Sequence, residues 1–325
     1  MEIYDLIVIG AGVSGLMAAI EGKSRGIEKV IVIEREDEPG GALNCCVHNG
    51  FYYKNIKENL TIPELIHKLT EEAITLGVKI SCNTTVLKIK NDKELHIINS
   101  EEGIKTIKGS AIILATGSRE RPFGYKNILG YGALAGIVTS CATLNYINKQ
   151  GVLPGKRCIV LGSDDIGMLA AKTLYLEGAT VKYIVETSNS IRAREEASKE
   201  VIDDFNLKVL FNHRVVKVYG TSRVTGVDIV KLDENFNIIK GSKEYVDCDT
   251  LVLCMQLKPD ATLAEKYNID INEETDGVIV DSSFQTSIKG IYACGTVIDG
   301  YNTVESSMRS GQQAGKSVAN LLVKK

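Results

Sequence analysis

The stretch Asp5-Leu-Ile-Val-Ile-Gly-Ala-Gly-Val-Ser-Gly15 lies at the start of the chain and predicts how the chain folds. Its apolar half, rich in β-branched residues, is typical of a strand buried in a parallel sheet. Three glycines follow at once, and a helix pattern runs over residues 16–26. Gly10 permits a tight turn, Gly12 lets a pyrophosphate approach the backbone, and Gly15 lets the helix pack against the strand.

A second strand-like run, Lys29–Ile33, ends at Glu34, 19 residues after Gly15. A carboxylate at this distance accepts hydrogen bonds from the ribose hydroxyls of a dinucleotide. The free N–H groups and the positive dipole end of the first helix bind the phosphates. Because strand, turn, helix and acid occur in this order, the sequence predicts a dinucleotide site that includes Gly10, Gly12, Gly15 and Glu34.

The same pattern recurs 152 residues later. The apolar run Arg157–Leu161 leads into Gly162 and Gly167, and a further strand ends at Glu186, so two glycines and the acid keep their spacing. Asp164 replaces the middle glycine, and a carboxylate that faces a pyrophosphate costs about 1–3 kcal/mol. Two alternatives stay open: the Asp164 side chain turns away from a bound nucleotide, or this second site has lost its function.

Composition excludes several classes of protein. Hydrophobic residues make up 44% of the 325 residues and charged residues 24%, so we expect a globular protein of two domains. The net charge of −3 and the absence of Trp argue against a nucleic-acid partner. No apolar run approaches the roughly 18 residues that a membrane-spanning helix needs, so we expect no membrane span.

The N-terminus and the cysteines bear on the cellular compartment. The opening residues MEIYDLIVIGAG lack the basic segment and the cleavage site of a signal peptide. The eight cysteines form no C-x-x-C and no zinc spacing, so we expect no metal site. We expect the protein to lie in the reducing cytoplasm.

The later part of the chain contains further strand and helix signals. Separate strand-like runs are expected at 104–108 and 111–115. Another apolar strand, residues 290–293, meets Cys294-Gly295-Thr296, and a final helix is expected over 302–323. The late glycine motif and the last helix belong to the first fold, which makes that fold discontinuous in sequence.

Taken together, four motifs resemble those of the pyridine nucleotide–disulfide oxidoreductase superfamily. They are GAGVSG at 10–15 with Glu34, IILATGSRERP at 112–122, the second dinucleotide unit, and FQTSIKGIYACGT at 284–296. The length is similar to that of thioredoxin reductases. The resemblance implies an α/β fold with two Rossmann-like domains of the three-layer ββα type, the second inserted in the first. The expected division is 1–118 with 255–325 for FAD, and 119–254 for NAD(H).

A narrower resemblance involves PGGALNCCVHNGF at 39–51 and the segment 157–186. These are similar to FAD-dependent oxidoreductases found beside anaerobic glycerol-3-phosphate dehydrogenase-like proteins. The narrower resemblance implies a dehydrogenase partner subunit.

The family resemblance implies which residues bind FAD. The late motif carries Thr296 where the family has Asp, so somewhat looser binding is expected. Val304 lies at the start of the last helix, whose positive end would face the flavin ring. The full predicted FAD set is Gly10, Gly12, Gly15, Glu34, Arg35, Gly41, Asn44, Val86, Ala115, Thr116, Gly117, Gly295, Thr296 and Val304.

By the same resemblance, Gly162, Gly167 and Glu186 would bind NAD(H), and Glu186 would favour NAD over NADP because a carboxylate repels a 2′-phosphate. Arg192 and Arg194 follow this strand. They could grip a phosphate, or they could mark an exposed helix start.

The usual redox-active cysteine pairs are missing. Where thioredoxin reductase-like members carry C-x-x-C, this chain has Cys141 alone, and the other family positions hold Leu43 and His48. The vicinal pair Cys45-Cys46 would form only a strained disulfide. His48 and Cys46 remain the catalytic candidates near the flavin, each weighed against a purely structural role.

The sequence therefore leaves three functional hypotheses. The first is an FAD-dependent oxidoreductase that passes electrons between NAD(H) and a small-molecule or protein acceptor. The second is an FAD-binding electron-transfer subunit with a degenerate NAD site, marked by Asp164. The third is a thiol or disulfide reductase that uses Cys45 and Cys46. A homodimer is the family habit.

Overall fold

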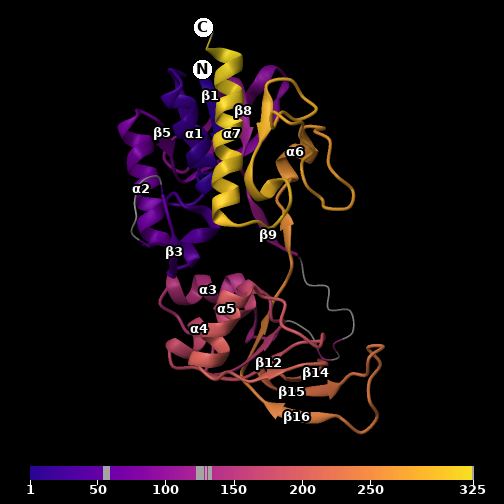
Figure 1. Ribbon diagram of the computed structural model, residues 1–325. Helices are drawn as coiled ribbons and strands as arrows, with labels where there is room; N and C mark the ends of the chain where they lie inside the picture. Colours follow the sequence, from indigo (N-terminus) through magenta and orange to yellow (C-terminus); the bar gives the residue numbers. More distant parts are fainter. Residues whose placement is uncertain (54–58, 122–127, 129, 131–133, 324–325) are drawn as a thin grey trace. The chain divides into compact units, whose positions relative to one another are not determined.

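The computed structural model describes residues 1–53, 59–121, 128, 130 and 134–323, and the chain divides into two compact units. Unit 1 comprises residues 1–119 and 257–325, and unit 2 comprises residues 120–256 (Figure 1). The chain passes from unit 1 to unit 2 one residue after the boundary expected from the sequence, and it returns to unit 1 two residues after the expected boundary. Which cofactor each unit holds stays a prediction.

A seven-stranded sheet forms the centre of unit 1, in the order β5-β2-β1-β8-β7-β6, with β19 paired to β8. The strands β5, β2, β1, β8 and β19 run parallel, while β6 and β7 form an antiparallel ribbon with β8. The strand bounds are β1 Glu2–Ile9, β2 Val30–Ile33, β5 Lys79–Ser81, β6 Thr84–Lys90, β7 Glu94–Asn99, β8 Gly103–Leu114 and β19 Ile291–Ala293.

Alternation along β1 separates two apolar layers. Leu6 and Val8 lie in the core shared with helices α1, α2 and α7, whereas Ile7 and Ile9 lie in the core beneath the β6-β7 ribbon and α6. The helix bounds are α1 Val13–Ser24, α2 Ile62–Thr75, α6 Thr262–Lys266 and α7 Val304–Leu322. Helices on one face and a β layer on the other confirm the ββα arrangement.

The last helix packs closely on the first, which explains why the chain's end belongs to unit 1 (Figure 1). A methyl group at Gly311 would lie 2.1 Å from the Ser14 carbonyl oxygen, and one at Gly315 would lie 2.4 Å from the Ala18 carbonyl oxygen. Only glycine permits this approach of α7 to α1.

Shorter elements complete unit 1 and its two crossings. They are a 3-10 turn at Gly41–Cys45, β3 Asn49–Phe51, β4 Leu60–Thr61, β18 Leu257–Pro259 and a 3-10 turn at Gly295–Val297, with β9 Ser118–Glu120 spanning the boundary between the units. Strands β9 and β18 pair with each other, so the outgoing and returning segments form one two-stranded ribbon.

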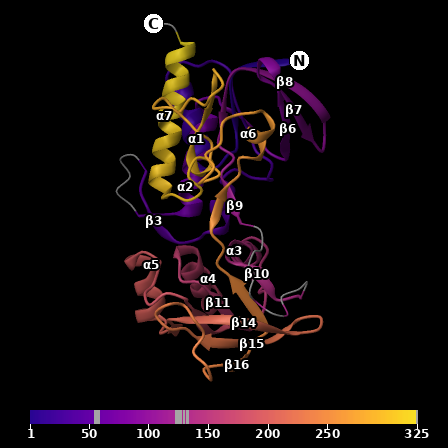
Figure 2. The same ribbon diagram turned by 90° about the vertical axis from the view of Figure 1, so that its right-hand side faces the viewer.

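Unit 2 repeats the parallel sheet in smaller form, in the order β10-β17-β11-β12-β13. An antiparallel sheet of β14, β15 and β16 packs against it through a separate apolar core in unit 2 (Figure 2). The bounds are β10 Ile137–Thr139, α3 Ser140–Asn148, β11 Arg157–Leu161, α4 Asp165–Leu176, β12 Thr180–Val185, α5 Glu195–Lys199, a π-helical turn Glu200–Asp204, β13 Val209–Leu210, β14 His213–Gly220, β15 Val224–Lys231, β16 Glu244–Asp247 and β17 Thr250–Leu253.

The part of the chain that the structure describes contains neither a membrane-spanning helix nor a cluster of metal ligands. Within it, no helix combines the length and the apolar character that a membrane crossing requires. Within the same residues, no three His, Cys, Asp or Glu side chains gather as a metal site.

Candidate functional site

The first glycine loop, between β1 and α1, closes so tightly that two of its positions exclude a side chain. Gly10 has φ +106°, and a methyl group there would lie 2.3 Å from the Ala115 carbonyl oxygen. A methyl group at Gly15 would lie 1.9 Å from the Gly10 carbonyl oxygen. The loop therefore packs against the end of β8, as the sequence pattern requires.

Gly12 is different, because the space beside it is empty. Among the residues that the structure describes, no heavy atom outside the chain neighbours of Gly12 lies within 4 Å of the place that a methyl group would take. Gly12 precedes α1 with no side-chain cap, and the first turn of the helix carries no acidic residue. The N–H groups at this helix start are therefore open to an anion such as a pyrophosphate.

Glu34 lies at the end of β2 with only 5% of its surface exposed. Its carboxylate accepts hydrogen bonds from the Ala11 N–H (2.7 Å) and the Glu36 N–H (3.0 Å). A carboxylate offers about four lone-pair directions, so these two bonds orient the group and leave capacity for ribose hydroxyls. Together with the open helix start, this donor and acceptor set fits a dinucleotide.

The segment after β2 closes over the same loop. A methyl group at Gly41, which has φ +60°, would lie 3.3 Å from the Gly12 Cα. The Gly40 N–H donates to the Ala11 carbonyl (2.9 Å). The Asn44 amide donates to the Pro39 carbonyl (3.0 Å), so Asn44 fixes this segment from within.

Asp260, which the sequence analysis missed, ties three predicted FAD residues together. Its carbonyl accepts from the Thr116 hydroxyl (2.8 Å), and its N–H donates to the Gly117 carbonyl (2.9 Å). Its carboxylate lies 3.8 Å from the Arg35 guanidinium. The residue directly follows β18, and nothing in its local sequence marks this role.

The remaining predicted FAD residues lie at other edges of unit 1. Gly295 has φ +76°, and its N–H donates to the Ser310 hydroxyl (2.9 Å). Thr296 is half-buried, and Val86 on β6 packs against the core beneath the ribbon. Val304 is the first residue of α7, whose start is capped by the preceding Thr303. Their contacts with FAD are predictions from the family resemblance.

The two catalytic candidates lie after the 3-10 turn. Cys46 packs against the core of unit 1, and burial, with a smaller contribution from Cys45, raises the pKa of its thiol to about 12. The His48 ring lies against the Phe51 ring, with centroids 5.3 Å apart. The eight cysteines all lie in the described part of the chain, and none of them forms a disulfide. A thiol with so high a pKa is a poor nucleophile at neutral pH, which favours the structural role for Cys46.

Cys141 lies in the first turn of α3. The Glu120 carboxylate accepts from the Cys141 N–H (3.0 Å) and from the hydroxyl of Thr139, the residue that caps the helix. A carboxylate therefore lies at the start of this helix, beside Cys141.

The second glycine loop, between β11 and α4, has the same framework as the first. Gly162 has φ +107°, and a methyl group there would lie 2.9 Å from the Cys254 Cβ. A methyl group at Gly167 would lie 2.4 Å from the Cys254 Sγ. Cys254 follows β17 as Ala115 follows β8, so it is the structural counterpart of Ala115.

Asp164 accepts the place of the middle glycine without backbone strain. Its φ and ψ of −76° and 170° are close to the −66° and 173° of Gly12. Its carboxylate accepts from the Gly167 N–H (2.8 Å) and so caps α4. Burial raises the pKa of Asp164, against the lowering effect of that hydrogen bond. The side chain thus occupies a helix start that is open in unit 1.

Glu186 is 1% exposed and accepts far more hydrogen bonds than its counterpart Glu34. Burial would raise its pKa, but hydrogen bonds and a nearby guanidinium outweigh burial and lower the pKa to about 2. The donors are the Ser163 N–H (3.0 Å), the Ser163 hydroxyl (2.7 Å), the Ser188 N–H (3.0 Å), the Thr187 hydroxyl (3.3 Å) and the Arg192 Nε (3.0 Å).

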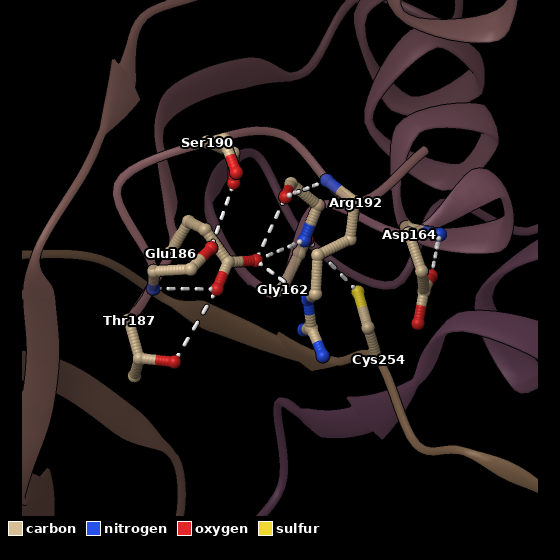
Figure 3. Close-up of polar contacts among 10 residues, drawn as sticks. Gly162, Asp164, Glu186, Thr187, Ser190, Arg192 and Cys254 are labelled. Atoms are coloured by element: carbon tan, nitrogen blue, oxygen red, sulfur yellow. Dashed lines mark hydrogen bonds and ion pairs between the residues drawn. The ribbon is translucent and has the colours of Figure 1, made fainter. Parts of the chain in front are cut away.

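The two arginines after β12 pair with acids of their own unit. Figure 3 shows the Arg192 side chain beside Glu186, with the Asp164 carboxylate lying away from that pair. The Arg192 Nη2 lies 3.1 Å from the place of a methyl group on Gly162. Arg194 pairs with Asp165 (2.9 Å). Each of the two guanidinium groups therefore already pairs with a carboxylate, and a phosphate would have to compete with that carboxylate for it.

Comparisons with known proteins agree on one family. Residues 4–314 match the family model described as pyridine nucleotide-disulphide oxidoreductase. A thioredoxin reductase of Borreliella burgdorferi is 26% identical over 297 residues, which cover 91% of this chain and 84% of that protein. One of Listeria monocytogenes is 27% identical over 304 residues, covering 91% and 86%.

The solved structures agree on the fold. The crystal structure of T. acidophilum thioredoxin reductase superposes with a TM-score of 0.78 at 21% identity and covers all of both chains. At this identity the likeness concerns the fold alone. It confirms the predicted α/β architecture with Rossmann-type dinucleotide-binding domains.

Proposed function

Because this chain belongs to the pyridine nucleotide-disulphide oxidoreductase family, we propose that it passes electrons through FAD between NAD(H) and an acceptor, without a protein dithiol. The family is FAD-dependent and uses a pyridine nucleotide. The observation that carries the proposal is the open glycine loop of unit 1, with an uncapped helix start beside an oriented, buried Glu34.

The residues of unit 1 suggest how FAD would be held. The start of α1 at Gly12 would bind the pyrophosphate, and Glu34 would bind the ribose of the adenosine. The Asp260 backbone fixes Thr116 and Gly117, which would line the cofactor. FAD supplies hydride and electron transfer when bound, and the chain supplies binding and orientation.

Electron transfer through a cysteine pair is disfavoured by two observations. The sequence contains no C-x-x-C, and Cys141 stands alone where thioredoxin reductase-like proteins carry that motif. The Cys141 N–H donates to the Glu120 carboxylate. The Cys46 thiol of the vicinal pair has a pKa raised by burial to about 12. The acceptor would therefore exchange electrons with the flavin directly.

A second candidate is an FAD-binding electron-transfer subunit with a degenerate NAD site. The observation that favours it is the second glycine loop, where Asp164 caps α4 and Arg192 pairs with Glu186. Its electron source would be a partner dehydrogenase, of the kind that the resemblance to proteins found beside glycerol-3-phosphate dehydrogenase-like proteins suggests. Homodimerisation and a cytoplasmic location belong to both candidates as proposals.

Anaerobic mixing of the purified flavoprotein with NADH separates the two candidates. The first predicts that the flavin absorbance near 450 nm is bleached at millimolar NADH, because hydride reaches the flavin. Flavin that dithionite reduces but NADH does not would contradict the first candidate and support the second. Protein that retains no FAD after purification and reconstitution would contradict both.

A further inference from the structure

We propose that Arg192 is an internal ligand of the second dinucleotide loop, one that must leave Glu186 before a nucleotide can bind there. The inference rests on the proposed function only in placing the nucleotide in unit 2. It concerns what fills the second loop, whereas the proposed function depends on the flavin in unit 1.

The first step is the contrast between the two ribose acids. Glu34 accepts two backbone N–H bonds, one on each carboxylate oxygen. On Glu186, three donors already share Oε2: the Ser163 N–H, the Ser163 hydroxyl and the Arg192 Nε. The other oxygen, Oε1, accepts from the Ser188 N–H and the Thr187 hydroxyl. A ribose hydroxyl that reached Oε2 would have to replace one of its three donors, and among these Arg192 is the one with an exposed side chain, at 46%.

The second step is that the backbone places Arg192 at this acid. The Ser163 hydroxyl accepts from the Arg192 N–H (3.1 Å), and the Ser163 carbonyl accepts from the Ala193 N–H (2.7 Å). In unit 1 the counterpart of Ser163 is Ala11, which has no hydroxyl to offer. The segment that carries Arg192 is thus bonded to the loop itself, and the guanidinium starts close to its partner.

The third step is the position of the guanidinium over the loop. Its Nη2 lies 3.1 Å from the place of a methyl group on Gly162, the glycine whose counterpart in unit 1 turns the chain toward an open helix start. A group that both neutralises the ribose acid and covers the glycine turn competes with a dinucleotide for the same atoms (Figure 3).

The charged residues around the Arg192–Glu186 pair provide a matched control. Asp164 and Asp165 lie at the start of α4, and Arg194 pairs with Asp165 rather than with Glu186. Arg194 therefore shares the segment and the charge of Arg192 but not its partner. This makes Arg194 a matched control for the effect of removing a positive charge near the loop.

The test is calorimetric titration of the FAD-loaded protein with NAD⁺, which binds without reducing the flavin. Arg192→Met keeps the apolar stem and removes the charge, and we expect it to lower the Kd for NAD⁺ roughly fivefold or more, as for a released coupling between two ligands. Arg194→Met should leave the Kd within about twofold, and Arg192→Lys should stay near the native value because the ammonium can still pair with Glu186.

Unchanged or weaker NAD⁺ binding by Arg192→Met would overturn the proposal, because Arg192 would then be neutral toward the nucleotide or one of its ligands. The same holds if neither the native protein nor Arg192→Met binds NAD⁺. An equal gain for Arg194→Met would also overturn it, since the effect would be one of general charge. FAD content and the far-ultraviolet circular dichroism spectrum check that each variant is folded.

Discussion

The two glycine loops share one backbone and differ in what fills it. Gly12 and Asp164 have nearly the same φ and ψ, and both precede a helix of twelve residues. In unit 1 the helix start is uncapped and Glu34 has hydrogen-bonding capacity to spare. In unit 2 an aspartate caps the helix and an arginine pairs with the acid. The glycine spacing therefore specifies the turn, while the side chains around it decide whether an anion can enter.

The contrast has an electrostatic side as well. The first turn of α1 contains no acidic residue, whereas α4 begins with Asp165 directly after Asp164. The Asp164 carboxylate accepts from the Gly167 N–H at this helix start, and both carboxylates interact favourably with its positive dipole end. In unit 1 these favourable interactions are available to a ligand, whereas in unit 2 they stabilise the protein itself.

The largest expected effect concerns Glu186 of unit 2, which pairs with Arg192. Because the pKa of Glu186 is lowered from 4.5 to about 2, its stabilising contribution is present above pH 4.5 and is lost as the pH falls toward 2. The shift corresponds to about 3 kcal/mol. Urea unfolding between pH 6 and 3 should show native stability falling more steeply than that of Glu186→Gln.

The control for that experiment is Glu244→Gln, a change at an exposed position on β16 of the same unit. It should keep the native pH dependence. Parallel curves for the native protein and Glu186→Gln would contradict the internal role of Glu186.

The next effect comes from making unit 1 resemble unit 2. Gly12→Asp should fold normally, because the backbone at Gly12 suits any residue and the space beside it is open. The new carboxylate should weaken FAD binding by roughly 5- to 150-fold, from about 1–3 kcal/mol of repulsion and lost helix-start donors. Fluorescence titration of the apoprotein with FAD measures it.

Gly12→Ala is the matched control, since it adds volume without charge. A smaller loss of affinity for Gly12→Ala than for Gly12→Asp is expected. Equal affinity of the native protein and Gly12→Asp for FAD would place the pyrophosphate elsewhere.

A smaller effect is expected from making unit 2 resemble unit 1. Asp164→Gly removes the cap of α4 and its carboxylate, and the stability should change by only a few tenths of a kcal/mol, as for other caps replaced by glycine. NAD⁺ binding should tighten about fivefold, and further when combined with Arg192→Met. If the single and double variants bind NAD⁺ no better than the native protein, filling of the loop is not what limits binding.

The smallest effect is expected at the vicinal cysteines. Cys45→Ser combined with Cys46→Ala should leave turnover with an artificial electron acceptor within about twofold, because a thiol with a pKa near 12 contributes little thiolate at neutral pH. The measurement is the anaerobic steady-state rate of the native protein and of the double variant with one and the same electron donor. Loss of turnover with retained FAD would support the third hypothesis, a thiol or disulfide reductase.

The repeated strand–turn–helix framework could be predicted from the sequence, because the spacing of its glycines and of the acid depends on local backbone conformation. Glycines that must turn or approach another strand, and an acid at the end of the next strand, leave a regular signature in both units. The discontinuous first fold also followed from the late glycine motif, and the contact of Gly311 and Gly315 with α1 gives its physical reason.

Other features could not be predicted, because they depend on contacts between distant residues. The expected break between runs 104–108 and 111–115 was wrong, since β8 is continuous over Gly103–Leu114. Gly109 interrupts the apolar pattern, yet a methyl group there would lie 2.9 Å from the Ala111 carbonyl oxygen, so the strand needs glycine. The roles of Asp260 and Arg192 depend on side chains that meet residues in other segments.

The most direct test of the contrast between the loops is a titration of native, FAD-loaded protein with NAD⁺, set beside the FAD content of the same sample. We predict close to one FAD per chain and NAD⁺ binding that does not saturate below millimolar concentration. NAD⁺ that saturates at micromolar concentration, with Asp164 and Arg192 both intact, would contradict the account of a second loop filled from within.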